Sequence, residues 1–448
     1  MKTHQSVSKV ALPLAWITGF ILAMLPFHAF LTVWLSSGLG HYTLLRLWKE
    51  FLITILLIGA VYLLVKNRPL FKVMAGSWLF RLMGLYALLL LLSGGLAYFG
   101  NSVAGKALAY GELLDLRFLV FFCIVWVIAA NSPVLYQNWR RLLLLPSLIV
   151  IIFGLVQYWL LPYDFLRHFG YGPNTISPYE TINHNLKYLR IESTLRGANP
   201  LGAYLLLIVT ALTTLIVRAK ARRVSKSIFL AAALVALTLT FSRSAWLGTL
   251  LSVGVVLWLS LKSDQARRTS LIVAGLVIFT AAIVGIGLRQ NTRLQDAVLH
   301  TDNQSTAQAS SNQGHSVAFK SGVSDIVHRP WGDGVGTAGP ASVYNKQPAR
   351  IAENYYLQIG QEAGLVGMGL FIAINVMVGW QLYKKRGDSL AVVLLASLVG
   401  LGFVNLLSHA WADDTLAYIW WGLAGICLAP AILTGRPKAK YGKTENIA

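Results

Sequence analysis

The sequence has only two cysteines and no histidine cluster, and both absences limit the kinds of site it can hold. Cys123 and Cys427 each lie inside an apolar run, where a free thiol behaves as a small hydrophobic group. Neither a disulfide framework nor a cysteine metal site is therefore expected. The loop histidines are scattered without the spacing of metal ligands: His184, His300, His315 and His328. We expect no metal site and no cofactor.

Acidic residues are also scarce, with 17 Asp and Glu against 38 Lys and Arg, a net charge of +21. In a soluble protein this balance would suggest nucleic acid as a partner. Here 56% of the residues are hydrophobic and only 12% are charged, and many apolar runs have membrane-spanning length. The chain is therefore predicted to be a polytopic membrane protein in contact with a lipid bilayer, with no nucleic-acid partner.

The apolar runs predict an all-α fold in which residues 1–448 form one membrane domain. The first run, Val10 to Leu35, is too long for a signal-peptide core and has no small-residue cleavage site within reach, so we expect it to be retained. Twelve spans are predicted, at about 10–36, 51–66, 82–99, 117–131, 142–161, 199–217, 227–241, 245–261, 270–288, 355–383, 389–409 and 415–434.

The basic residues predict the orientation of these spans. With a cytoplasmic N-terminus, 23 of the 38 Lys and Arg, including the tail at 435–448, fall on the inner side. The short outer loops hold five: Arg46, Lys49, Lys106, Arg117 and Arg243. This asymmetry follows the positive-inside rule, so both termini are expected in the cytoplasm. Two long segments, 163–199 and 289–354, are then expected outside, in a GT-C-like arrangement.

Connections as long as these two outer segments are uncommon unless they are functional or disordered. In the second, apolar residues recur at roughly helical spacing, which predicts a short amphipathic helix over the outer membrane face. These residues are Val317, Phe319, Val323, Ile326 and Val327.

Arginines at the outer membrane surface suggest an anionic substrate. Arg243 lies in FSRSAWLG, between two apolar runs with almost no loop, where a charge is costly; it is either functional or a snorkelling interface residue. Arg190 and Arg196 precede the predicted span at 199, with Asn199 at its entry. Arginine there suits the oxygens of a lipid-linked pyrophosphate, although anionic head groups or loop carboxylates would also satisfy it.

The last part of the long loop carries glycines and a candidate base. GVGTAG at 334–339 formally matches GxGxxG, but it follows no predicted strand, so tight turns are the better interpretation. Glu353 is our candidate general base, although a carboxylate at the start of a helix could also be there because the helix dipole stabilises its negative charge. Glu362 is interpreted as a buried structural acid. His409, with Asp413 and Asp414, is expected to cap the predicted span at 389–409 on the outer side.

Four motifs in fixed order resemble the bacterial O-antigen ligase and O-antigen polymerase superfamily. They are RIESTLRGANPLGAYL, TFSRSAWLG, HRPWGDGVG and ENYYLQIGQEAGLVG, and the resemblance covers about residues 187–435. It implies a glycosyltransferase of the bacterial cytoplasmic membrane that uses a polyprenyl-pyrophosphate-linked glycan on the outer side, with Arg190 and Arg243 holding the pyrophosphate. Ligases commonly have histidine and then asparagine where this chain has Glu353 and Asn354, which favours a polymerase.

The implied chemistry suits the candidate residues. Sugar-linked pyrophosphate is a good leaving group, so an enzyme must stabilise its charge and deprotonate an acceptor hydroxyl of a glycan or lipid-linked acceptor. Arg190 and Arg243 would do the first and Glu353 the second, in an inverting, metal-independent transfer. The predicted substrate-binding residues are Arg196, Asn199, His328, Arg329, Asn354 and His409.

Two other classes of function remain open. A secondary transporter would ordinarily show broken helices, internal symmetry and ionisable residues near the membrane midplane, and only Glu362 is a clear candidate for such a residue. A non-catalytic partner in polysaccharide assembly is the other alternative, and it would require the outer arginines to be dispensable.

Overall fold

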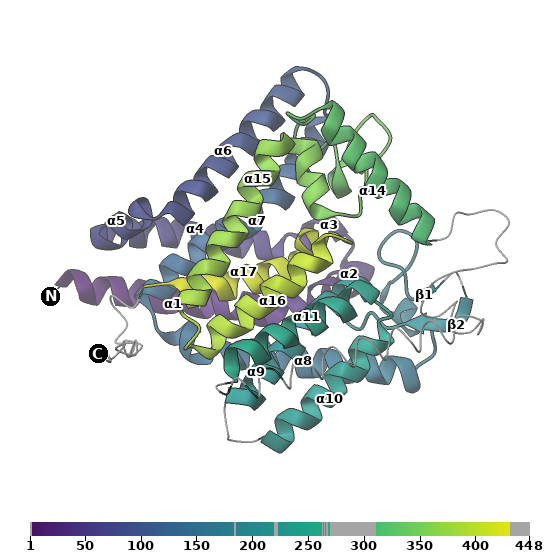
Figure 1. Ribbon diagram of the computed structural model, residues 1–448, viewed down its shortest axis with the longest axis horizontal. Helices are drawn as coiled ribbons and strands as arrows, with labels where there is room; N and C mark the ends of the chain where they lie inside the picture. Colours follow the sequence, from purple (N-terminus) through teal and green to yellow (C-terminus); the bar gives the residue numbers. More distant parts are fainter. Residues whose placement is uncertain are drawn as a thin grey trace.

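The computed structural model describes residues 2–182, 185–218, 223–261, 263, 265, 268 and 311–430 (Figure 1). Within these residues most of the chain is helical, and two short strands form one antiparallel sheet. The elements, in order, are α1 (Lys2–Met24), η1 (Leu25–Phe27), α2 (His28–Leu39), α3 (Tyr42–Arg46), α4 (Trp48–Lys66), α5 (Arg68–Gly76), α6 (Trp78–Phe99), α7 (Gly105–Asn131), α8 (Val134–Trp159), η2 (Phe165–Phe169), β1 (Glu180–Ile182), β2 (Asn185–Arg190), α9 (Ala198–Arg218), α10 (Arg223–Leu239), α11 (Arg243–Ser260), α14 (Ser311–His328), η4 (Gly339–Tyr344), α15 (Tyr355–Lys384), α16 (Ser389–Asn405), η5 (Ala410–Ala412) and α17 (Asp414–Leu428).

Within the described residues, eight helical segments are long and apolar enough to cross a membrane, which makes the chain a multi-pass membrane protein. They are Lys9–Leu39, Trp48–Lys66, Trp78–Phe99, Gly105–Asn131, Val134–Trp159, Ala198–Arg218, Arg243–Ser260 and Tyr355–Lys384. α10, α16 and α17 are shorter, with 17, 17 and 15 residues. The predicted span at 270–288 lies outside the described residues, so the total of twelve and the GT-C-like arrangement stay predictions.

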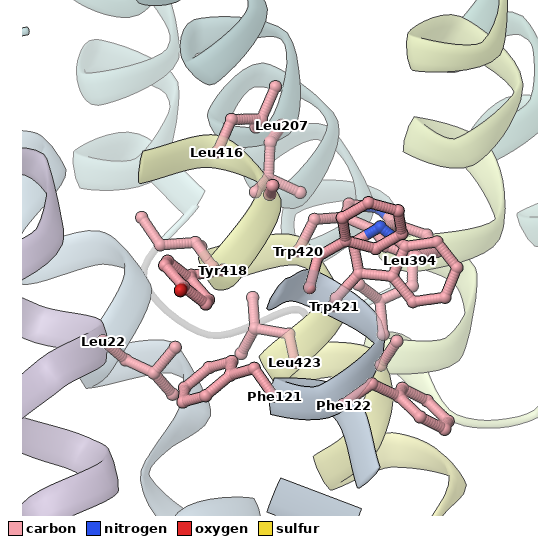
Figure 2. Packing of buried hydrophobic residues seen from close by; sticks show 14 of the residues in the cluster. Leu22, Phe121, Phe122, Leu207, Leu394, Leu416, Tyr418, Trp420, Trp421 and Leu423 are labelled. Carbon is pink, nitrogen blue, oxygen red and sulfur yellow. The ribbon is translucent and has the colours of Figure 1, made fainter. Parts of the chain in front are cut away.

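The shortest of these three helices, α17, is the centre of the fold. All of its residues from Asp414 to Leu428 are buried, which is the pattern of a helix surrounded by protein on every side. Trp420 and Trp421 pack at a ring-centroid distance of 5.2 Å (Figure 2). From α7, Phe122 packs against Trp421 at 6.0 Å and Phe121 packs against Tyr418 at 5.1 Å. Because α17 is enclosed by other helices, lipid contact falls to the helices around it.

Helix α7 begins earlier than the sequence predicted. It starts at Gly105, whereas the predicted span starts at 117, so Arg117 lies within the helix and not in an outer loop. Arg117 is buried and donates a hydrogen bond of 2.6 Å to the carbonyl oxygen of Ala412. The hydropathy pattern missed this start because the first turns of α7 carry Glu112, Asp115 and Arg117.

Close contacts between small residues fix the helices that surround the candidate site. A Cβ atom on Gly202 of α9 would lie 2.9 Å from the Cβ atoms of Ser242 and Ala245, so the first turns of α9 and α11 touch. Farther along α11, Gly248 meets Gly400 of α16 backbone to backbone. Such approaches are open only to small residues. They bring Asn199 and Arg243 to the same end of the bundle.

The amphipathic helix predicted in the long outer segment is present as α14, at the right of the bundle beside α15 (Figure 1). Fewer of its apolar side chains are buried than its sequence pattern suggests. Ile326 is 6% exposed, whereas Val317 and Val327 are 66% and 70% exposed. α14 therefore contacts the protein along one row of side chains and leaves part of its apolar surface uncovered.

The glycines of HRPWGDGVGTAG form tight turns, as the sequence predicted. Gly332, Gly334, Gly336 and Gly339 all have positive φ angles, between 62° and 97°. The turns pair with α15 where Gly364, at φ 69°, interrupts it: Asp333 N donates to Gln361 O and Leu365 N donates to Pro330 O, both at 2.8 Å. This pairing satisfies backbone groups that the interruption would otherwise leave without partners.

The carboxylate of Glu362 completes this pairing. Its Oε1 accepts hydrogen bonds from the backbone N–H groups of Gly336, at 2.9 Å, and Ala338, at 3.4 Å, and the residue is fully buried. Asp115 of α7 is close enough to interact electrostatically with Glu362. The prediction that Glu362 is a buried structural acid is confirmed.

Replacing Gly332 with alanine should destabilise the protein. The φ angle of 80° disfavours any residue with a Cβ atom by about 1–2 kcal/mol, and the new Cβ would lie 2.5 Å from the Glu362 carbonyl oxygen. We expect a lower unfolding temperature for the detergent-purified protein by differential scanning fluorimetry. Gly172→Ala is the control, because a methyl group there enters open space. Equal unfolding temperatures for both variants would contradict this account.

Candidate functional site

A cavity of about 790 Å³ lies where the first turns of α9, α11 and α15 meet the segment between α16 and α17. Its volume is in the range of small-ligand sites. Seven of the nine predicted site residues line it, from four separate parts of the chain: Arg190, Arg196, Asn199, Arg243, Glu353, Asn354 and His409. The fold therefore gathers residues up to 219 positions apart, from Arg190 to His409, around one space.

Arg190, the last residue of β2, is held by three different elements. Its Nε donates to the carbonyl oxygen of Thr240 at 2.8 Å, and one terminal nitrogen donates to Oδ1 of Asn199 at 2.6 Å. The other terminal nitrogen lies 3.3 Å from a carboxylate oxygen of Glu180, its cross-strand neighbour. Burial lowers the pKa of Arg190, and the Glu180 charge opposes that shift. The guanidinium is therefore fixed before any substrate binds.

The segment that joins Arg190 to Arg196 is buried and tightly bonded. Ser193 adopts a positive φ of 53°, and its hydroxyl donates to the carbonyl oxygen of Val150 at 2.7 Å. The hydroxyl of Thr194 donates to the carbonyl oxygen of Pro26 at 2.8 Å. These bonds attach the segment to α8 and η1, which sets the separation between the two arginines. Sequence reasoning singled out the arginines and missed the residues that place them.

Arg243 is presented by a sharp turn between α10 and α11. Phe241 has a φ of 50°, which is unusual for a bulky residue and is maintained here by the surrounding bonds. The indole nitrogen of Trp246 closes the turn by donating to the carbonyl oxygen of Leu237 at 2.9 Å. Arg243 is half-buried and is the first residue of α11, where the helix dipole adds to its positive charge. Thr240, which anchors Arg190, belongs to the same turn.

Glu353 and Asn354 have different roles at the start of α15. Asn354 caps the helix: its Oδ1 accepts from the N–H of Leu357 at 3.0 Å, and its Nδ2 donates to the carbonyl oxygen of Leu406 at 2.9 Å. Glu353 precedes this cap with a φ of 52°, a conformation that costs a non-glycine residue about 1–3 kcal/mol. The cap thus fixes the position of Asn354, the residue that follows Glu353. Both residues line the cavity.

His409 lines the same cavity as the arginines and interacts electrostatically with Glu353 and Arg196. Burial lowers the pKa of His409 to about 4; the charge of Glu353 opposes this shift and that of Arg196 adds to it. The imidazole is therefore neutral near pH 7. Within the described residues its Nε2 is shielded from solvent and has no hydrogen-bond partner.

Arg196 and Asp413 form the boundary of the cavity on the side of α17. Nε of Arg196 lies 3.7 Å from Oδ2 of Asp413, and the Arg196 side chain is 48% exposed. Asp413 accepts from the N–H of Leu416 at 3.1 Å and so caps the start of α17. The sequence assigned His409, Asp413 and Asp414 to the end of the preceding span, but α16 already ends at Asn405.

Two predicted binding residues, His328 and Arg329, do not line the cavity. Arg329 forms a two-pronged ion pair with Asp333, both contacts at 2.9 Å, and is 65% exposed. His328 ends α14, with its Nδ1 2.7 Å from the carbonyl oxygen of Ser324. The HRPWGDGVG motif that contains them forms the turn that pairs with α15.

The cavity also has apolar walls that sequence reasoning did not identify. Leu247 of α11, Phe319 of α14 and Leu406 and Leu407 after α16 line it and are between 46% and 49% exposed. The four leucine and phenylalanine side chains lie near the polar groups without belonging to any polar motif. In the sequence each of them looks like an ordinary apolar residue of a helix, so only the fold shows that they line one cavity.

No group of three or more metal-binding side chains occurs among the residues that the structure describes. The carboxylates and imidazole in the cavity, Glu353, Asp413 and His409, are accompanied by three arginines. This donor set suits an anionic ligand more readily than a cation.

Residues 228–372 match the O-antigen ligase family. The matched segment runs from α10 through α11 and α14 into α15, and it includes Arg243, Glu353 and the turn that pairs with Glu362. The match confirms the resemblance to the O-antigen ligase and polymerase superfamily, and with the membrane-spanning helices it supports a membrane protein of polysaccharide biosynthesis. No curated protein matches the chain in sequence.

The buried neutral state of His409 predicts a pH dependence of stability. Its pKa is about 4 in the folded protein and about 6.5 when unfolded, so the folded state binds fewer protons in that window. The stabilising contribution is complete above about pH 6.5 and is lost as the pH falls toward 4. We expect acidification from about pH 7 to pH 4.5 to lower the unfolding temperature of the wild type more than that of His409→Gln. Equal losses would refute the lowered pKa.

Proposed function

We propose that the protein is a membrane glycosyltransferase that moves a glycan from a polyprenyl-pyrophosphate carrier to an acceptor hydroxyl, as an O-antigen or exopolysaccharide polymerase or ligase. The observation that carries this proposal is the single cavity in which Arg190, Arg196 and Arg243 face Glu353 and His409. The family match over residues 228–372 supports the same class of reaction.

The site is proposed to face the outside of the cytoplasmic membrane of a bacterium, with both termini in the cytoplasm. The charge pattern of the sequence supports this orientation, because the predicted inner segments hold 23 of the 38 Lys and Arg when the N-terminus is inside. No nucleotide sugar would be required there, since the carrier-linked glycan is already activated.

Arg243 and Arg190 are proposed to bind the pyrophosphate of the donor. Guanidinium groups make paired, charge-assisted hydrogen bonds to phosphate oxygens. Arg190 already uses its Nε and both terminal nitrogens on Thr240, Asn199 and Glu180, so a phosphate there would compete with Glu180. Arg243, at the start of α11, combines its own charge with the helix dipole. We therefore assign the larger share of phosphate binding to Arg243.

The apolar side chains at the cavity wall suit the lipid part of the same donor. Leu247, Phe319, Leu406 and Leu407 would contact the polyprenyl chain next to the pyrophosphate. Burying apolar area against them contributes roughly 25 cal/mol per Å². One cavity with arginines and exposed apolar groups matches a ligand that is charged at one point and hydrocarbon beyond it.

In the proposed reaction an acceptor hydroxyl oxygen attacks the anomeric carbon of the donor sugar. The bond from that carbon to the pyrophosphate oxygen breaks, and the leaving group takes the bonding electrons while the arginines stabilise its charge. The Glu353 carboxylate receives the hydroxyl proton. Direct displacement inverts the anomeric configuration, which NMR of the product would show. Retention would exclude this mechanism.

Arg243→Ala should reduce transfer by on the order of 10²–10³, the usual effect of removing one donor that stabilises developing charge. The measurement is transfer in liposomes that contain the purified protein and a carrier-linked repeat unit. Arg167→Ala is the matched control, because Arg167 is exposed, pairs with Asp164 and lies outside the cavity. Normal transfer by Arg243→Ala would refute the proposed pyrophosphate site.

Glu353→Gln should lower kcat by on the order of 10²–10⁴ and leave donor affinity nearly unchanged, because glutamine keeps the shape and cannot accept the proton. Single-turnover kinetics and donor titration in the same liposomes separate the two quantities. Glu353→Asp should retain part of the rate. Weaker donor binding with an unchanged chemical step would mean that Glu353 is not the base.

The liposome system also distinguishes the two members of the superfamily. With the carrier-linked repeat unit as sole substrate, a polymerase produces a ladder of longer glycans, since the same molecule serves as donor and acceptor. Glu353 at the position where ligases commonly have histidine favours this outcome. A single product formed only when a different acceptor is added would identify a ligase.

A further inference from the structure

A second cavity, of about 390 Å³, lies next to the first on the side of α2, α3 and α7. Arg196 lines both cavities, and Asp413 in the first is followed directly by Asp414 in the second. The two cavities are therefore adjacent at the start of α17 and at the Arg196 side chain, which is 48% exposed. Nothing in the proposed donor site uses this second space.

The carboxylate of Asp414 at the base of the second cavity is saturated with internal partners. Its Oδ2 lies 3.0 Å from Nζ of Lys49, 3.4 Å from Nε2 of His28 and 4.0 Å from a terminal nitrogen of Arg117. Lys49 also contacts Glu50 at 3.2 Å. Asp414 is thus held mainly by Lys49 and His28, and its charge also acts on Arg46.

Arg46, the last residue of α3, supplies the excess charge. Within the described residues, its guanidinium has one hydrogen bond, of 3.3 Å to the Tyr110 hydroxyl, and lies 5.9 Å from the centre of that ring. Around the cavity the structure places four cationic side chains against three carboxylates when His28 is neutral. The cations are Arg46, Lys49, Arg117 and Arg196, and the carboxylates are Glu50, Asp413 and Asp414. One positive charge remains uncompensated.

The other walls of the cavity carry groups that suit a sugar. Tyr42 and Tyr110 contribute aromatic rings and hydroxyls, and Thr32 adds a further hydroxyl. The hydroxyls of Thr175 and Ser177 donate to the carbonyl oxygens of Gly170, at 2.9 Å, and Tyr179, at 2.8 Å, so toward a ligand they can act as acceptors. Aromatic surface combined with several small polar groups binds ligands that are apolar on a ring face and polar at its edge. An uncompensated arginine among such groups favours a sugar that carries one negative charge.

We propose that this second cavity is the acceptor subsite and that it binds an anionic sugar unit, with Arg46 recognising its carboxylate or phosphate. The inference rests on the proposed function, because the neighbouring cavity must hold the donor. An acceptor sugar here would direct its hydroxyl past Arg196 toward Glu353. Arg196, weakly held by Asp413 at 3.7 Å, then separates the two ligands.

The test is calorimetric titration of the purified full-length protein in nanodiscs with three disaccharides. One carries a uronic acid, one carries a phosphate, and one is the neutral, carboxyl-reduced counterpart of the first. The wild type should bind a charged disaccharide, and Arg46→Gln should bind it at least about tenfold more weakly, as expected for losing a charged hydrogen bond. Both proteins should bind the neutral disaccharide equally weakly. The preferred charged ligand identifies carboxylate or phosphate as the natural group.

Two further variants keep the result interpretable. Arg167→Gln, in the exposed Asp164 pair, should bind like the wild type. Arg46→Lys should recover part of the affinity, because it keeps the charge without the paired geometry. In the transfer assay Arg46→Gln should raise KM for the acceptor and leave donor affinity unchanged.

The inference is overturned if Arg46→Gln binds the charged disaccharides as the wild type does, if the neutral disaccharide binds as tightly, or if none of the three binds. Its failure is distinct from failure of the proposed function. Normal transfer by Arg243→Ala would remove the donor site whatever the disaccharides do, whereas unchanged binding by Arg46→Gln would remove only the acceptor subsite.

Discussion

The arrangement of the candidate site depends on the hydrogen bonds and the ion pair made by the Arg190 guanidinium. It joins the end of β2 to Thr240, in the turn that presents Arg243, and to Asn199 at the start of α9. Glu180 completes the set and also accepts from the N–H of Ala198 at 3.3 Å. One side chain thus sets the relative positions of three elements, so the proposed phosphate-binding geometry would exist before a donor arrives.

The charged residues of the site could be predicted from the sequence because charged residues are rare in this chain, at 12%. Arg243 between two apolar runs and Glu353 at a helix start are conspicuous for that reason, and the fold places both on one cavity. The eight long spans were likewise evident from hydropathy. α17 was recognisable as an apolar helix, but its complete enclosure by other helices is a property of packing that periodicity does not encode.

What the sequence could not predict depends on contacts between distant residues. Arg46 looked like an ordinary outer-loop cation, and only the fold shows it beside Tyr110 with Asp414 already occupied by Lys49. In the opposite sense, Arg329 stood in a conspicuous motif but pairs with Asp333 away from the cavity. A motif can be distinctive because it folds a turn, and residue type alone does not separate that role from substrate binding.

The central claim is that the cavity binds the donor pyrophosphate through Arg243. A cryo-electron-microscopy structure of the full-length protein in nanodiscs with a non-hydrolysable polyprenyl-pyrophosphate glycan would test it most directly. Phosphate density is expected within hydrogen-bonding distance of the Arg243 guanidinium, with the sugar toward Glu353 and the prenyl chain along Leu247 and Leu406. Phosphate density elsewhere, with Arg243 contacting only protein, would contradict the claim.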